Sequence, residues 1–174
     1  MRGPDVGGMT RGIMRLGLRL ARFTYLFIGL LASRRLRVVG HSMEPFLRDG
    51  DLILITRRVP GRRPPRRGDV VAFRDPLTNG TSIKRICGLP GESLRLAEGA
   101  LIVQGETLPE PYAMPGREGE HRDMEWTVGA DEYVLLGDNR GDSRDSRAFG
   151  PVRRSAIMGR AWFRYAPADR SGRL

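Results

Sequence analysis

The chain has 174 residues and a mass of 19.4 kDa, enough for one compact domain with a core plus an anchor or tail. Thirty basic residues against twenty acidic ones give a formal charge of +10. This length excludes two ordinary domains, and the single cysteine, Cys87, excludes an intramolecular disulfide framework. With one cysteine and two histidines, we expect neither a bound metal nor another cofactor.

The N-terminal segment predicts membrane association. Residues 1–9 are Gly-rich and are expected to be disordered. Residues 10–33 predict a helix with four arginines along one side and the apolar run 23–32 after them. We interpret residues 10–37 as a membrane anchor, with the N-terminus inside and the rest of the chain on the outer face.

How this segment meets the membrane is left open by its length. An apolar run of ten residues is shorter than the roughly 20 that cross a bilayer, so a spanning helix and an interfacial helix both remain. A cleaved secretory peptide is the rival interpretation. It is disfavoured because Leu30 stands where a small residue should precede a cut after Ala32.

After Arg37 the sequence predicts strands. Short runs rich in Val, Ile and Leu, separated by Gly and Pro, lie at 52–56, 69–73, 82–87, 93–96, 100–103 and 132–136. Since no helical periodicity of useful length separates them, they predict a mostly β, antiparallel domain over residues 38–167. Loops are expected at 57–67 and 109–123, and a C-terminal tail at 168–174.

Lys84 is the one lysine beside 29 arginines, and it forms a candidate pair with Ser42. A serine hydroxyl becomes a good nucleophile only when a base takes its proton, and lysine is one of the bases that proteins use. The pKa of a lysine in water is about 10.4, so burial must lower it. Arginine cannot become neutral, which explains a lysine here. Strand alternation places Lys84 on the face of Ser82, away from Arg85.

Three other residues are weaker candidates. His41 adjoins Ser42, but neighbours in an extended segment face opposite sides, so it is poorly placed as the base. His121 lies in a polar loop and is expected to be solvated. Cys87 lies on the strand face opposite Lys84 and is expected to be buried and inert.

Five segments follow one another along the chain: GHSMEP at 40–45, GDVVAF at 68–73, KRICGLPGE at 84–92, EPY at 110–112 and GDNRGDSRDSRAFGPV at 137–152. Between Gly40 and Pro167 the chain thereby resembles the type I signal peptidase family of serine proteases, in its short single-anchor form. The resemblance implies that Ser42 is the nucleophile and Lys84 the general base. It also implies an antiparallel β-sheet catalytic domain behind one N-terminal membrane-associated helix.

The last segment is the most distinctive. By resemblance, Ser143 hydrogen-bonds the lysine amine, and Asp145, Arg147 and Asp138 form the polar network that shapes the wall of the site. The alternative for these charged residues is a structural turn held by carboxylate and guanidinium pairs. A calcium loop is disfavoured because arginines alternate with the aspartates.

The sequence departs from many relatives at two positions near the nucleophile. Ser42 offers its own backbone N–H to the oxyanion. Some relatives add a hydroxyl two residues earlier, where this chain has Gly40, so a main-chain or water donor must replace it. Phe46 stands where many relatives carry a small hydroxyl residue, which alters the nearby substrate pocket.

The implied activity is that of a membrane-bound endopeptidase of the plasma membrane that removes signal peptides from exported preproteins. Small residues at the first and third positions before the cut would enter shallow apolar pockets. A dedicated maturase that trims one partner is an alternative. A non-enzymatic alternative is a basic surface at 57–67 that binds anionic lipid. Nucleic acid is not expected as a partner, since aromatic interleaving and a binding motif are lacking.

Overall fold

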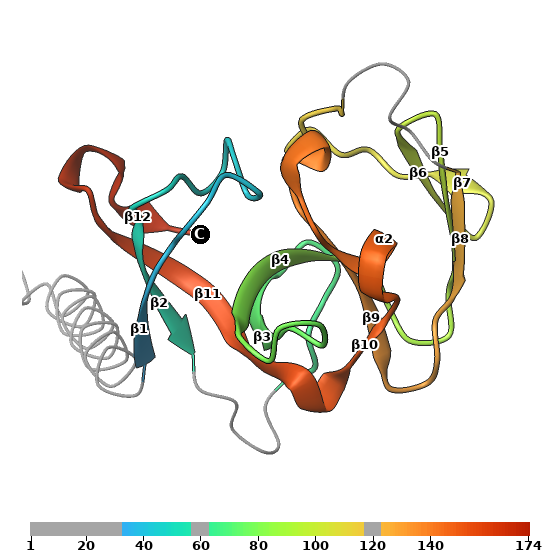
Figure 1. The fold of residues 1–174 in the computed structure, drawn as a ribbon, viewed down its shortest axis with the longest axis horizontal. Helices are drawn as coiled ribbons and strands as arrows, with labels where there is room; N and C mark the ends of the chain where they lie inside the picture. Colours follow the sequence, from blue (N-terminus) through green and yellow to red (C-terminus); the bar gives the residue numbers. More distant parts are fainter. Residues whose placement is uncertain (1–32, 57–62, 117–122) are drawn as a thin grey trace, which may run out of the picture. The chain divides into compact units, whose positions relative to one another are not determined.

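A computed structural model describes residues 33–56, 63–116 and 123–174. Residues 34–174 form one compact unit (Figure 1). The expected disordered segment 1–9 and the expected anchor helix, up to residue 32, lie outside the described residues, as do 57–62 of the basic loop. In the part of the chain that is described, no helix has the length and apolar character needed to cross a membrane.

The larger sheet contains eight strands. Seven of them follow the order β1-β2-β11-β3-β4-β9-β10, and β12 pairs with β11. Their bounds are β1 Ser33–Arg37, β2 Leu52–Thr56, β3 Val70–Arg74, β4 Thr81–Gly88, β9 Glu132–Leu136, β10 Val152–Arg153, β11 Ile157–Ala166 and β12 Gly172–Arg173. The pairs that β11 makes with β2 and β3, and that β4 makes with β3 and β9, are antiparallel. In Figure 1 the long β11 passes beside both β2 and β3.

A smaller sheet has the order β7-β6-β5-β8. Its strands are β5 Ser93–Ala97, β6 Ala100–Val103, β7 Glu106–Thr107 and β8 Met124–Thr127. In β5, Leu94 and Leu96 are buried while their neighbours Ser93 and Arg95 are exposed, as expected for a sheet with one solvated face. The inward side chains pack with Cys87 and with Val134, so the smaller sheet shares a core with β4 and β9.

Short helical turns complete the structure. The α-helix α2 covers Ser146–Phe149, and 3₁₀ turns cover Arg140–Asp142, Arg154–Ala156 and Ala168–Arg170. Asp145 caps α2, because its side chain accepts a hydrogen bond from the Arg147 backbone N–H. This cap fixes the turn at residues 145–149, within the distinctive sequence segment 137–152.

The core contains two further apolar clusters beside the larger sheet. One is centred on Val71, Phe73 and Leu135. The other includes Met43 and Leu47, which lie outside the strands and are almost completely buried against the sheet. The segment that carries Ser42 is therefore held by two side chains inserted into the core.

The mostly β, antiparallel architecture agrees with the sequence prediction, and three strands, at 52–56, 100–103 and 132–136, have the predicted bounds. β11 is the longest strand and the predicted strands did not include it. Its sequence carries Gly159, Arg160 and Arg164 among apolar residues, so the alternation of apolar and polar residues that marks a strand is not visible. Both arginines find acidic partners elsewhere in the fold, at Asp69 and Asp51 respectively.

Both boundaries of the predicted catalytic domain differ in the structure. Residues 33–37, expected in the anchor, form β1, because the sheet pairs this arginine-rich stretch with β2. Residues 168–174, expected as a tail, contain β12, and Leu174 packs on the cluster around Met43. The compact unit that contains these strands covers residues 34–174.

The C-terminal residues are tied to the nucleophile segment through Asp51, whose side chain is buried. Its carboxylate accepts from Arg164 Nη1 at 3.3 Å and from Arg170 Nη2 at 3.0 Å. Arg164 also donates to the Phe46 carbonyl oxygen at 2.9 Å. One buried charge with two guanidinium partners thus joins β11, the 3₁₀ turn after it and the loop that follows Ser42.

Candidate active site

Ser42 lies on a tight loop between β1 and β2. Gly40 begins this loop with a φ of +86°, a backbone conformation that suits glycine, and its N–H donates to Asp49. From the opposite side, the Asn139 backbone N–H donates to the Ser42 carbonyl oxygen at 3.1 Å. The Asn139 side-chain amide donates to the His41 carbonyl oxygen at 3.2 Å. The nucleophile segment is therefore fixed by hydrogen bonds at Gly40, His41 and Ser42.

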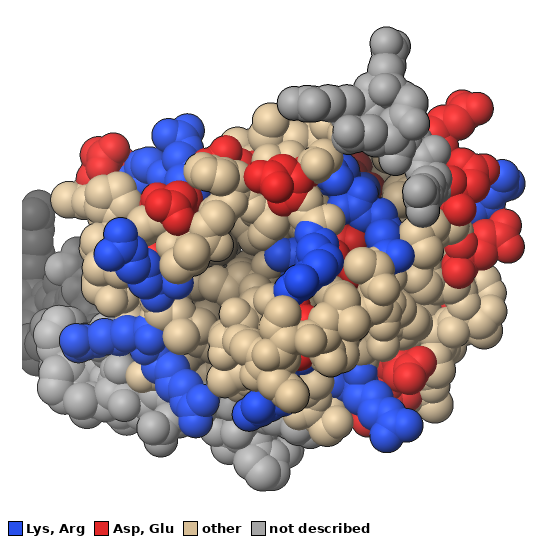
Figure 2. Space-filling model, viewed as in Figure 1, with Lys and Arg blue, Asp and Glu red and all other residues tan. Residues whose placement is uncertain are grey.

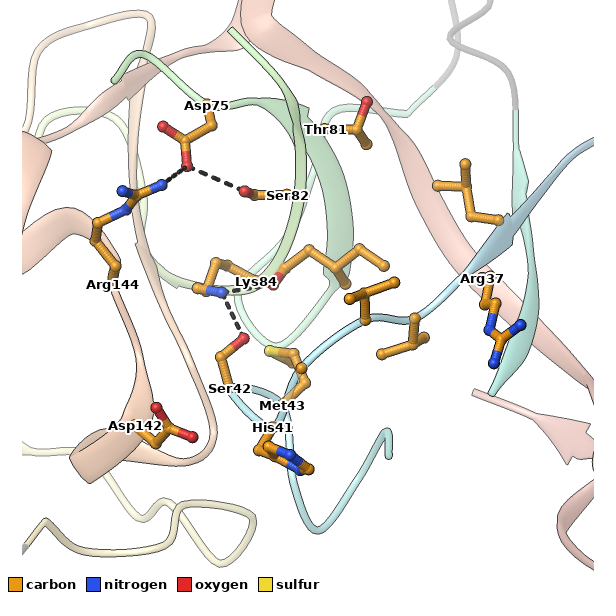
Figure 3. Close-up of a pocket in the computed structure, with 15 residues that line it drawn as sticks. Arg37, His41, Ser42, Met43, Asp75, Thr81, Ser82, Lys84, Asp142 and Arg144 are labelled. Atoms are coloured by element: carbon orange, nitrogen blue, oxygen red, sulfur yellow. Dashed lines mark hydrogen bonds and ion pairs between the residues drawn. The ribbon is translucent and has the colours of Figure 1, made fainter. Parts of the chain in front are cut away.

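Lys84 lies in the middle of β4, where it pairs with Val71 of β3. Its Nζ donates to Ser42 Oγ at 2.7 Å and to the Ile83 carbonyl oxygen at 3.0 Å. Figure 3 shows the two side chains pointing toward one another from β4 and from the loop after β1. Residues 42 positions apart in the sequence are thus brought into direct contact.

The Lys84 side chain is shielded from water, with only 5% of the residue exposed. Burial lowers the pKa of the Lys84 amine, while the carboxylates of Asp145 and Asp75 act in the opposite direction. The net direction is downward, which favours the neutral amine. A neutral amine in contact with a hydroxyl can accept its proton.

Two other predicted site residues, Ser143 and Arg147, contact Asp145. Ser143 Oγ donates to Asp145 Oδ2 at 2.8 Å, and the Gly137 backbone N–H donates to the same oxygen at 3.0 Å. Arg147 forms an ion pair with Asp145 at 2.8 Å. The hydroxyl of Ser143 is thereby directed to a buried carboxylate, the stronger acceptor, and the described partners of the Lys84 amine are Ser42 and the Ile83 carbonyl.

The negative charge of Asp145 is stabilised by its hydrogen-bond partners. Burial alone would raise the pKa of this carboxyl, but the hydrogen bond and charge of Arg147, together with the hydrogen bonds from Gly137 and Ser143, lower the pKa. Asp145 therefore stays ionised and places a permanent negative charge near the Lys84 amine.

Asp138 faces a different partner. Its carboxylate receives two hydrogen bonds from Arg85, at 2.8 and 2.6 Å. The Arg85 guanidinium lies between the rings of Phe46 and Tyr112, at 4.7 and 4.2 Å from their centroids. This ion pair, with its stacked rings, fixes the part of β4 that carries Lys84. The Phe46 ring is accommodated near the nucleophile by its contact with the Arg85 guanidinium.

A cleft of about 600 Å³ opens beside Ser42 and Lys84. Two stretches of chain line its opposite parts, residues 36–43 and residues 81–84, and Asp75, Asp142 and Arg144 complete the lining. An extended peptide laid between two such stretches can add main-chain hydrogen bonds to them. The cleft thus combines an elongated binding surface with the paired hydroxyl and amine.

Sequence reasoning missed the wall formed by Asp75, Ser82 and Arg144. Ser82 Oγ and Arg144 Nη2 both donate to Asp75 Oδ2, at 3.0 and 3.3 Å (Figure 3). Strand alternation did place Ser82 on the side of Lys84. Nothing in the sequence pointed to Asp75, because its arginine partner lies 69 residues away.

Among the weaker candidates, His41 and Cys87 have partners other than the Lys84 amine. His41 is largely exposed and pairs with Glu44 at 3.1 Å. Cys87 is buried, and burial raises the pKa of its thiol to about 12. His121 lies outside the described residues. Within the described ranges, no cluster of three or more His, Cys, Asp or Glu side chains is arranged to hold a metal ion.

Gly137 marks the closest approach between the nucleophile segment and the turn that carries Ser143. A Cβ at this position would lie 2.1 Å from Ser143 Oγ and 2.5 Å from the Ser42 carbonyl oxygen. We expect Gly137→Ala to lower the free energy of unfolding by about 2 kcal/mol and to reduce activity more than tenfold, because backbone must move. Thermal unfolding and peptidase assays measure both effects. Gly172→Ala is the matched control, since nothing lies within 4 Å there.

Comparisons with known proteins agree with this geometry. A sequence model of the family described as "Signal peptidase, peptidase S26" matches residues 13–166. Signal peptidase I of Leptolyngbya laminosa is 33% identical over 177 residues, covering 95% of this chain and 84% of that protein. Signal peptidase I of Streptococcus pneumoniae is 28% identical, covering 84% of this chain and 92% of that protein.

A solved structure agrees as well. The crystal structure of a signal peptidase I from Enterococcus faecalis matches with a TM-score of 0.51 and 32% identity. The match covers 56% of this chain and 97% of that chain. On the combined evidence of sequence and fold, this chain belongs to the signal peptidase family, peptidase S26.

Proposed function

We propose that the protein is a membrane-bound serine endopeptidase, a signal peptidase I, that cleaves signal peptides from exported preproteins. Ser42 is the nucleophile and Lys84 the general base. The observation that carries the proposal is the 2.7 Å contact between Lys84 Nζ and Ser42 Oγ, made by an amine that is almost fully buried. Family membership supports the same substrate class, since the similar proteins are named signal peptidases.

Each step of the reaction uses these two side chains. The neutral Lys84 amine takes the proton from Ser42 as Oγ attacks the scissile carbonyl carbon. The resulting ammonium then gives this proton to the leaving amine, and the carbonyl carbon remains bound to Oγ as an ester. Lys84, neutral again, takes a proton from water as the water attacks the ester, and Ser42 is released with its proton restored.

The surroundings of the pair support this cycle. The bond from Lys84 Nζ to the Ile83 carbonyl oxygen fixes the amine beside Ser42, so little reorganisation precedes proton transfer. The Ser42 backbone N–H is the first donor for the oxyanion, and because Gly40 lacks a side chain, the second donor is main chain or water. The peptide lies in the cleft between residues 36–43 and 81–84.

Membrane attachment is the second part of the proposal. Residues 10–37 were predicted as the anchor, and because Ser33–Arg37 form a strand, we assign the proposed anchor to the residues before Ser33. The plasma membrane, with the catalytic domain on its outer face, places the cleft near translocated preproteins. On the face shown in Figure 2, basic side chains lie in separate groups with acidic ones between them. The proposed contact for anionic lipid is the basic segment 57–67, of which residues 57–62 lie outside the described residues.

The test is cleavage of a purified preprotein by the full chain in detergent or vesicles, with the new N-terminus identified by mass spectrometry. We expect one cut, after a small residue that also has a small residue two positions before it. Profiling many preproteins separates a general peptidase from a maturase with a single client. An intact preprotein, or cuts scattered along it, would contradict the proposal.

A further inference from the structure

Three carboxylates act on the charge of the Lys84 amine, and each has its own arginine partner. The pairs are Asp145 with Arg147 at 2.8 Å, Asp138 with Arg85 at 2.6 Å and Asp75 with Arg144 at 3.3 Å. Unpaired, each carboxylate would stabilise the ammonium form of Lys84 and so oppose its use as a base. The three arginines therefore offset the negative charge that the carboxylates place near the amine.

The pair of Asp75 and Arg144 differs from the other two. The Arg85 and Arg147 guanidinium groups lie mostly inside the protein, whereas the Arg144 side chain is 53% exposed and lines the cleft. Asp75 is buried and accepts hydrogen bonds from the Leu77 and Thr78 backbone N–H groups as well as from Ser82. Asp75 is thus fixed and charged, and Arg144 is its one cationic partner among the described residues.

Geometry places this pair beside the reacting amine. Ser82 is two residues before Lys84 on β4 and links Asp75 to that strand. Arg144 follows Ser143 in the chain, and its guanidinium donates to Asp75 (Figure 3). The guanidinium therefore bridges the two segments that flank Lys84.

We propose that Arg144 is a positioning residue which, by pairing with Asp75 across the cleft wall, keeps Lys84 in the neutral form that can accept the Ser42 proton. The proposal rests on the function proposed above. Arg144 works through Lys84 and does not itself transfer a proton.

The sign of the effect follows from the charges. Asp75 raises the pKa of Lys84 and Arg144 lowers it, so removal of Arg144 leaves a buried negative charge that favours the ammonium. Asp145 and Asp138, which also act on the amine, keep their own partners in such a variant, and Asp142 and Arg37, which line the same cleft, are unchanged by it. Catalysis that needs the neutral amine then requires a higher pH.

The experiment is the pH profile of kcat/KM for preprotein cleavage by the full chain in detergent. For Arg144→Ala we expect the acidic limb to move to higher pH, so that kcat/KM relative to wild type is about three- to tenfold lower on that limb than on the plateau. Arg144→Lys keeps the charge and should restore the wild-type limb. Ser82→Ala removes a hydrogen bond but no charge, and it should leave the limb in place whatever its effect on the plateau.

Asp75→Asn supplies the opposite change. The amide oxygen can still accept from the loop backbone, but the negative charge is gone, so the acidic limb should move to lower pH. In the double variant Asp75→Asn with Arg144→Ala, the acidic limb should return toward its wild-type position. A merely structural role would lower activity without moving the limb in opposite directions.

His41 needs a separate control because it lines the cleft and its pKa is raised by Glu44. The Arg144→Ala displacement should be the same in a His41→Gln background. Arg144→Ala with an unshifted limb, or Arg144→Lys shifted as far as Arg144→Ala, would overturn the inference. Residual cleavage by Lys84→Ala would instead refute the proposed dyad, so the two failures are distinguishable.

Discussion

Ser42→Ala should abolish preprotein cleavage, lowering kcat/KM by at least about a thousandfold. The hydroxyl is the atom that bonds to the substrate carbon, and within the described residues no other hydroxyl contacts the Lys84 amine. A binding site alone would retain only the small rate enhancement that comes from holding the peptide. The measurement is single-turnover cleavage of a preprotein by the full chain in detergent.

Two controls make this result specific. Ser93→Ala, at an exposed position at the start of β5, should cleave at the wild-type rate. Ser42→Ala should still bind the preprotein, since the cleft walls are intact. Turnover by Ser42→Ala near the wild-type rate would show that the proton-transfer pair has been misassigned.

Lys84→Ala should be as inactive as Ser42→Ala, and Lys84→Arg should fail as well. Arginine retains the positive charge but cannot give up its proton at any pH that the protein survives, so it cannot act as the base. The double variant of Ser42 and Lys84 should lose no more than either single variant, because the two side chains act as a unit. Cleavage assays of the three variants measure this non-additivity.

Lys84→Met should stabilise the fold while it destroys activity. Burial lowers the pKa of Lys84 in the folded state, so below that pKa the folded protein bears the cost of a buried ammonium. Stability of the wild type should therefore rise as the pH rises from the folded pKa toward the higher unfolded one. Lys84→Met should lack this rise and show a Tm higher by about 2–4 °C at neutral pH. A Tm below that of the wild type would contradict a destabilising amine.

The structure brings Ser42 and Lys84 into the contact that the sequence predicted. The pair alone was a weak signal, because any chain of this size has serines and a basic residue, and the five family segments made it specific. The exact bounds of β2, β6 and β9 followed from short runs of Val, Ile and Leu. β11 was missed because its arginines pair with acidic residues more than 90 positions away, contacts that no local pattern reveals.

The polar surroundings of Lys84 show the same limit. Ser143 was expected to contact the amine, but the structure directs its hydroxyl to Asp145, since a buried carboxylate held by Arg147 is the stronger acceptor. Asp75 had no signal at all in the sequence. It depends on a turn that brings Leu77 and Thr78 backbone groups onto one carboxylate, and on an arginine from a distant segment.

The link from Asp51 to the C-terminal residues bears on biosynthesis. A nascent chain that ends at Pro167 carries all five family segments, and yet it lacks Arg170, which supplies one of the two guanidinium partners of Asp51. Asp51 then keeps only Arg164 of its two guanidinium partners. A nascent chain of this length should therefore hold the loop behind Ser42 less firmly than the full chain does.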